Sequence, residues 1–133
     1  RPDRRGRGHR AGSGRRGKRL AGAVRWRLDW GDKLDWLHAL AEEGDVLPAL
    51  ENQPELPDHL SFVWQAFWQL PSDRPAGMGG VLPIPFSSMD RSAQRYGIGE
   101  VDDFDSFTNL IQQMDSEYLR WAAAKAKRQE KAK

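Results

Sequence analysis

The chain has 133 residues, of which 38% are hydrophobic and 30% charged, and it contains no cysteine. This size fits one small domain, and the lack of cysteine excludes disulfides and thiolate metal sites. The formal charge of +2 is unevenly spread along the chain. Residues 1–25 carry ten basic side chains and one acidic side chain, and residues 122–133 carry five basic side chains and one acidic side chain. Residues 26–121 carry six basic and seventeen acidic side chains. We therefore expect an acidic domain over residues 26–125 between a basic arm, residues 1–25, and a basic tail, residues 126–133.

The arm of residues 1–25 is rich in arginine and glycine. It offers little apolar area to offset the entropy of ordering, so its composition predicts disorder, and we expect deletion of residues 1–24 to leave the fold unchanged. One interpretation is a solvated tail, or a non-native or frameshift-derived extension, since the chain does not begin with Met. The other is an arm whose arginines make weak contacts with nucleic-acid phosphates, namely Arg4, Arg5, Arg7, Arg15 and Arg16.

Four segments have helical periodicity, and no useful length of chain alternates as a strand does. The first, about residues 29–43, ends at Gly44. The second, about residues 57–70, lies between two prolines and is apolar over most of its circumference. Prolines and glycines exclude a helix from residues 71–85. The sequence thus predicts an all-α fold, a small bundle of about four helices.

The two remaining helices follow the Gly/Pro segment. The third, from about residue 87 to Tyr96, should be capped by a serine and closed by Gly97. The fourth, about residues 102–128, should pack on the second helix, while its polar last turns project from the body. Its apolar residues step by three and four positions: Phe104, Phe107, Ile111, Met114, Tyr118 and Trp121.

No group of residues has the spacing of a catalytic or metal site. His9, His38 and His59 share no ligand spacing, and the acids of residues 102–105 are explained by their place at a helix N-terminus. The serines have no base partner in a motif. No apolar run approaches the roughly 18–20 residues that span a bilayer. We expect a protein that is not an enzyme, with no metal, cofactor or membrane partner.

Six tryptophans are more than so small a core can easily enclose. Some indoles should therefore remain partly exposed, and exposed tryptophan is typical of binding surfaces. Five large aromatic residues are the candidates for partner binding. They belong to the second helix, the segment after it and the fourth helix: Trp64, Trp68, Phe86, Tyr118 and Trp121.

A series of motifs runs over about residues 56–121: LPDHLSFVWQAFWQL, then Asp73-Arg74, Gly77-Met78-Gly79, IPFSSMD, RYGI and MDSEYLRW. This order resembles the tail assembly chaperones of long-tailed phages and related prophages. The resemblance covers about half of the chain. It implies a non-enzymatic protein of the host cytoplasm that binds tape-measure and tail tube proteins and is absent from the finished tail. Some such proteins are made by programmed frameshifting, which would suit the arginine-rich arm.

Two alternatives to this interpretation stay open. One is a virion structural subunit of the tail or neck that uses the same surface permanently. The other is a nucleic-acid-binding regulator that uses the basic arm. Salt dependence separates the regulator from a protein-binding adaptor, because phosphate contacts weaken steeply as salt rises.

Overall fold

A computed structural model of the chain describes residues 2–70, 74 and 80–132, with side chains from Gly14 onward. The all-α class is confirmed, because these residues form helices and no strand. The elements in chain order are α1 (Pro2–Trp30), the 3-10 turn η1 (Gly31–Lys33), α2 (Leu34–Glu42), α3 (Pro48–Glu51), the 3-10 turn η2 (Asp58–Leu60), α4 (Ser61–Gln69), α5 (Phe86–Arg95) and α6 (Val101–Ala132).

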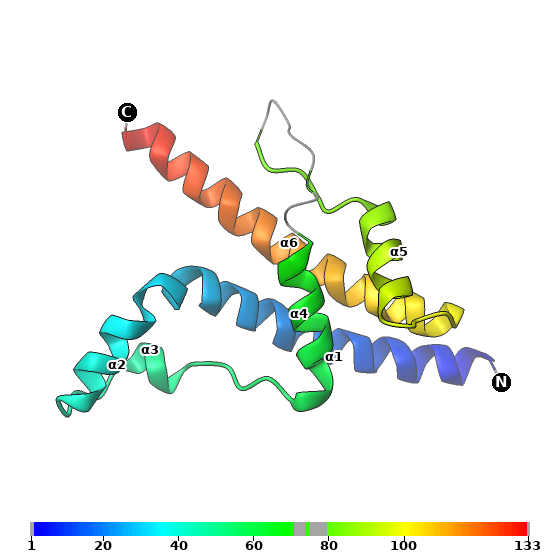
Figure 1. The fold of residues 1–133 in the computed structure, drawn as a ribbon, viewed down its shortest axis with the longest axis horizontal. Coiled ribbons are helices and arrows are strands. Elements are labelled where there is room, and N and C mark those ends of the chain that lie inside the picture. Colours follow the sequence, from blue (N-terminus) through cyan, green and yellow to red (C-terminus); the bar gives the residue numbers. More distant parts are fainter. Residues whose placement is uncertain (1, 71–73, 75–79, 133) are drawn as a thin grey trace.

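Two long helices, α1 and α6, form the frame of the molecule (Figure 1). They run in the same direction and separate toward their C-terminal ends. α4 crosses them, and α5 lies beside the N-terminal half of α6. The C-terminal end of α6 projects from the body, and every residue from Ala123 to Ala132 is exposed. The projecting helix end was predicted from its lack of large apolar residues.

The core lies where α1, α4 and α5 meet α6. Phe67 of α4 and Ile111 of α6 are fully buried in one cluster, which confirms the predicted packing of the second helix on the fourth. The large aromatic ring of Phe107 is buried with them. The other members come from all four helices and the segments beside them: Leu20, Val24, Leu60, Val63, Ala66, Leu70, Ile84, Met89, Ala93, Leu110 and Met114.

The expectation that residues 1–25 lie outside the body as a disordered arm is wrong for the part that carries Leu20 and Val24. Both side chains are 0% exposed, and both belong to helix α1. With Leu28, which packs on the same core, they recur every four residues along one face of the helix. Composition predicted disorder because apolar residues are few. The helical spacing of Leu20, Val24 and Leu28 places them on one face, which packs against the apolar seam of α6. This tertiary packing stabilises α1, whose residues have too low a helix propensity to form the helix alone.

Close contacts outside the core also join α1 to α6. Gly17 is buried against α6, where an added Cβ would come within 1.9 Å of the Gln113 Oε1 atom. The end of the Gln113 side chain therefore occupies the space beside the Gly17 backbone. One turn before the end of α1, Arg25 Nη1 lies 3.6 Å from Glu117 Oε1.

Several predicted helix ends are confirmed by the backbone. Gly44 and Gly97 follow α2 and α5 with φ angles of 99° and 74°, a conformation that favours glycine. The expected serine cap of α5 is wrong, because the helix begins at Phe86 after an extended Pro85, and no side chain caps it. The sequence did not predict the short helix α3 between the first two helical segments.

A buried ion pair joins Arg74 to α6. The guanidinium of Arg74 and the carboxylate of Asp115 form a salt bridge in which the side chains are 9% and 8% exposed. The other carboxylate oxygen of Asp115 accepts a hydrogen bond from the Ile84 N–H at 3.0 Å. Arg74 also donates to the Leu82 carbonyl oxygen at 2.8 Å, and its guanidinium lies 4.4 Å from the centroid of the Tyr118 ring.

Candidate partner-binding surface

None of the six tryptophans is fully buried. Trp36 on α2 is 58% exposed, and the other five are half-buried. Trp26 has a structural contact, since its indole N–H donates to the Ala49 carbonyl oxygen at 2.9 Å and so ties α1 to α3. The prediction that some indoles remain partly exposed is confirmed, and the surface therefore carries much of the aromatic area of the chain.

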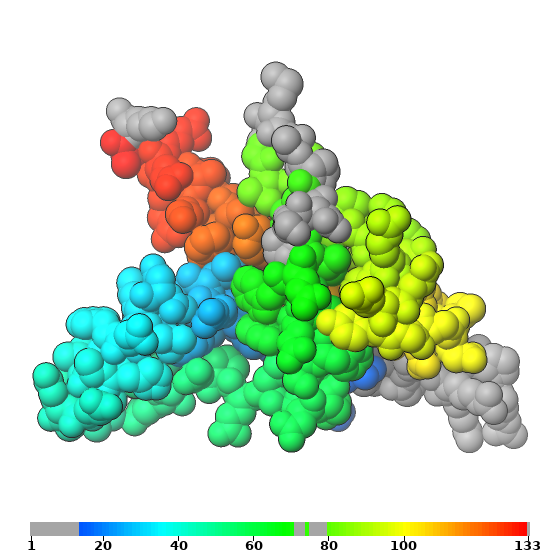
Figure 2. Space-filling model, viewed as in Figure 1, coloured from blue at the N-terminus to red at the C-terminus, as the bar shows by residue number. Residues whose placement is uncertain are grey.

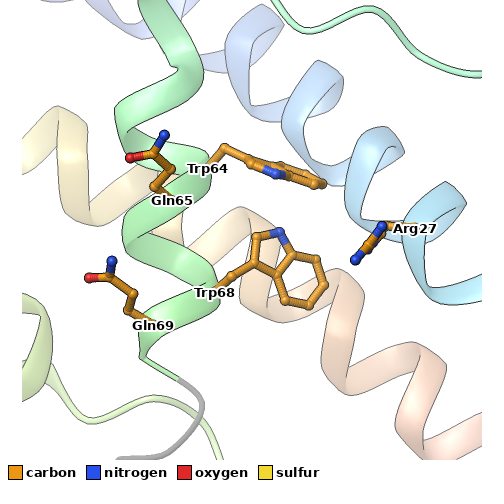
Figure 3. Close-up of a pocket in the computed structure, with 5 residues that line it drawn as sticks. All are labelled: Arg27, Trp64, Gln65, Trp68 and Gln69. Carbon is orange, nitrogen blue, oxygen red and sulfur yellow. The ribbon is translucent and has the colours of Figure 1, made fainter. Parts of the chain in front are cut away.

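A groove of about 540 Å³ lies between α4 and α1 (Figure 3). We call it the double-tryptophan groove. Trp64, Gln65, Trp68 and Gln69 line it from α4, and Arg27 lines it from α1. Figure 3 shows both indoles extending from α4 toward α1, with Arg27 on the opposite wall. Among the described residues, the groove therefore places two indole rings opposite one cation.

The two indoles of this groove are held in place by packing. The Trp64 and Trp68 ring centroids are 5.4 Å apart at an interplanar angle of 70°, and Trp68 meets the buried Phe67 ring at 5.1 Å and 81°. The Trp68 N–H is buried and has no hydrogen-bond acceptor among the described residues. Its nitrogen edge is turned toward the Trp64 ring (Figure 3), an arrangement that suits a weak N–H···π contact. The two indoles therefore form an edge-to-face pair that packs against the hydrophobic core.

A second groove, of about 560 Å³, lies between the C-terminal ends of α1 and α6. We call it the terminal groove. Trp30 of α1 and Trp121 of α6 line it, and each indole carries a lysine ammonium over its ring, Lys33 at 5.5 Å and Lys125 at 5.0 Å. The Tyr118 and Trp121 ring centroids are 6.0 Å apart, and the Tyr118 ring also contacts the Arg74 guanidinium. The lining of this groove therefore includes two indoles and the two lysines that lie over them.

Phe86 lies apart from both grooves. It is the first residue of α5, is 60% exposed, and meets Phe104 edge-to-face with 5.6 Å between ring centroids. Phe104 stands 17 residues before Trp121 on the same helix, which is about 26 Å along the axis. The structure therefore brings Trp64 and Trp68 together, and Tyr118 and Trp121 together, but places Phe86 elsewhere.

Some lining residues were not predicted. Arg27 and Trp30 belong to the end of α1, which sequence reasoning divided between an arm and a shorter helix. Lys33 and Lys125 follow Trp30 and Trp121 by three and four positions. This spacing, which brings side chains together on a helix surface, is the signal that could have identified both lysines.

The basic arm and the histidines form no site among the described residues. Arg15 is exposed and Arg16 is half-buried on α1, whereas the side chains of the other three arginines proposed for nucleic-acid contact lie outside the described part. His38 and His59 are exposed. Within the described ranges, no three His, Cys, Asp or Glu residues are grouped to hold a metal ion. None of the described helices is long and apolar enough to cross a membrane.

Comparison with known proteins identifies the family. Residues 39–120 match the phage tail assembly chaperone family. Because this match covers more than half of the sequence, the chain belongs to that family, and the resemblance noted over residues 56–121 is confirmed. The matched region includes α4, α5 and most of α6, with the Trp64–Trp68 pair, and it ends one residue before Trp121. No curated protein and no solved structure matches the chain. In the matched region, residues 71–73 and 75–79 lie outside the described residues, and with them Asp73 of one motif and the whole of Gly77-Met78-Gly79.

Proposed function

We propose that this protein is a non-catalytic chaperone of tail assembly that binds helical segments of the tape-measure and tail tube proteins in the host cytoplasm. The family supports a role in tail assembly. The observation that carries the partner proposal is the double-tryptophan groove, in which two half-buried indoles stand beside an open volume of about 540 Å³.

The geometry of Trp64 and Trp68 suits the binding of an amphipathic helix. Large aromatic anchors dominate the energetics of many interfaces because they remove much apolar area from water. The two indoles contact each other, and Trp68 also contacts Phe67, so little side-chain entropy is lost on binding. A client helix can lay its apolar face across them. Arg27 on the opposite wall then favours one orientation of a client that carries an acidic residue.

The experiment is a pull-down of the tagged chain from phage-infected or induced cells, followed by mass spectrometry. Wild-type protein should recover the tape-measure or tube protein, and Trp64→Ala should reduce the recovery. Trp36→Ala is the matched control, because it removes an exposed indole on α2 that lines neither groove. Nuclease treatment should change nothing. Recovery of nucleic acid alone would contradict the proposal and favour the regulator.

A second measurement separates the chaperone from a virion structural subunit. Purified virions should lack the chain, whereas a structural subunit would be present in fixed copy number. Quantitative mass spectrometry of virions measures this directly. Stoichiometric presence in finished particles would replace the chaperone proposal with the structural alternative.

A further inference from the structure

The terminal groove differs from the double-tryptophan groove in its charge. Three cations line it, Lys33 from η1 and Lys125 and Arg128 from α6. Two acids, Asp29 and Asp32, also line it. Asp29 is engaged by Arg25, whose Nε lies 3.2 Å from its Oδ2 atom. The cations are therefore the less compensated groups of this groove.

The charge of the surrounding chain strengthens this contrast. Residues 26–121 carry seventeen acidic and six basic side chains, whereas residues 122–133 carry one acidic and five basic ones. The projecting end of α6 thus places a local positive surface on an acidic domain. Such a surface attracts negatively charged partners and gives an interface its orientation.

The shape of the groove suits a helix. α1 and α6 separate toward their C-terminal ends (Figures 1 and 2), and the terminal groove occupies the space between these ends. Its volume of about 560 Å³ is room for a few side chains rather than for a folded domain. Its apolar floor comes from Leu28, Trp30 and Trp121. A third helix laid between α1 and α6 could insert apolar side chains there and point its flanking residues at the cations.

Nucleic acid could also be attracted by tryptophans among cations, since bases stack on exposed ring faces. Here one face of each indole already carries a lysine. Lys125 lies over Trp121 at 5.0 Å, Tyr118 contacts the same indole at 6.0 Å, and Lys33 lies over Trp30 at 5.5 Å. Each lysine ammonium has three N–H donors and can still donate to a carboxylate on its side away from the ring. These contacts favour an acidic peptide over a stacked base.

We propose that the terminal groove selects client helices that carry Glu or Asp beside their apolar face. This inference rests on the proposed function, because it takes the partner to be a client segment, and it adds the chemistry by which the client is recognised. The apolar residues supply contact area, and Lys33, Lys125 and Arg128 supply selectivity. Clients with basic flanks are repelled by the same cations.

The test uses three fluorescein-labelled amphipathic helical peptides that share one Leu/Phe face and carry Glu, Gln or Lys at the flanking positions. Binding to the full chain is measured by fluorescence anisotropy at moderate salt. The Glu peptide should bind about tenfold more tightly than the Gln peptide, and the Lys peptide should bind most weakly. A labelled single-stranded oligonucleotide is measured in parallel.

Two charge-reversal variants give the matched comparison. Lys125→Glu with Arg128→Glu changes two residues that line the groove, and Lys127→Glu with Lys131→Glu makes the same change in charge on residues of α6 that do not line it. The first variant should weaken the Glu peptide about tenfold and reverse the order of the three peptides, and the second should change affinity by less than about threefold. Circular dichroism checks that both variants remain folded.

Three outcomes would overturn the inference. They are equal binding of the Glu, Gln and Lys peptides, equal effects of the two variants, and tight binding of the oligonucleotide without binding of the Glu peptide. None of these tests the proposed function, which depends on recovery of tail proteins by the wild-type chain. A wild-type chain that binds tail proteins and ignores the peptide charges would keep the chaperone proposal and remove the selectivity.

Discussion

Removal of the Asp115 carboxylate should lower the free energy of unfolding, because this carboxylate is the counter-charge of a buried guanidinium. Asp115 neutralises the guanidinium of Arg74 and accepts the N–H of Ile84, and both ionic side chains are less than one-tenth exposed. In Asp115→Ala the guanidinium stays buried without its counter-charge. Breaking a buried pair by removing one partner typically costs about 3–5 kcal/mol. We expect a value near the lower end, about 3 kcal/mol, because the two ionic side chains keep 9% and 8% of their surface exposed.

Two further variants separate charge from hydrogen bonding. Asp115→Asn keeps an acceptor for the Ile84 N–H but removes the charge, so it should cost about 1.5–3 kcal/mol, the range of a hydrogen bond to a charged group. Replacing both Arg74 and Asp115 with Leu removes the charges together. This double variant should lose less stability than Asp115→Ala, because an apolar pair of similar volume leaves no buried charge behind.

Urea unfolding followed by far-UV circular dichroism measures all four proteins, and the linear dependence on urea gives the free energies of unfolding. The free energy of unfolding should be highest for the wild type and should decrease in the order double variant, Asp115→Asn and Asp115→Ala. A loss below about 0.5 kcal/mol for Asp115→Ala, as at an ordinary surface position, would refute the view that the buried ion pair between Arg74 and α6 stabilises the fold.

Three other predictions concern the core and the helix ends, and they are measured by the same unfolding assay. Leu20→Ala should cost about 2–5 kcal/mol because Leu20 is fully buried in α1; Val46→Ala, at a residue 75% exposed, is its control and should change stability by less than about 0.5 kcal/mol. An equal effect of the two would mean that α1 is not docked. Phe67→Ala or Ile111→Ala should each cost about 2–5 kcal/mol, since both side chains are 0% exposed, and a negligible loss at both would remove the packing of α4 on α6. Gly97→Ala should cost about 1–2 kcal/mol, because its φ of 74° is unfavourable for residues with a Cβ, and an unchanged stability would contradict that backbone conformation.

The helices that sequence reasoning located well are those with a long apolar pattern and a glycine at the end. The seam that includes Phe107, Ile111 and Met114 steps by three and four residues, and it is buried as expected. Gly44 and Gly97 end helices for the stated backbone reason. These signals are local, so they can be read from a single stretch of chain.

The role of α1 could not be obtained in that way. Between Arg15 and Arg25, Leu20 and Val24 are the only large aliphatic residues, and composition therefore outweighed spacing. The burial of these two side chains depends on a partner face that belongs to α6, about ninety positions later in the chain. A contact at that separation leaves no trace in local composition. The same reason hid the terminal groove, since Trp30 and Trp121 come from those two helices.

The positions of the candidate site residues were predictable only in pairs. Trp64 and Trp68 are four apart on one helix, and Tyr118 and Trp121 are three apart on another, so each pair shares a helix face. Whether the two pairs and Phe86 meet depends on how the helices cross. The structure separates Phe86 from Trp121 by about half of the length of α6.

The proposed function requires that the double-tryptophan groove binds a tail protein. Isothermal titration calorimetry of the purified chain with the tape-measure and tube proteins of its own phage tests it most directly. Wild-type protein should bind at least one of them, Trp64→Ala should weaken that binding by roughly 2 kcal/mol or more, and Trp36→Ala should leave it unchanged. The account is contradicted if neither tail protein binds, or if Trp64→Ala remains folded and binds as tightly as the wild type.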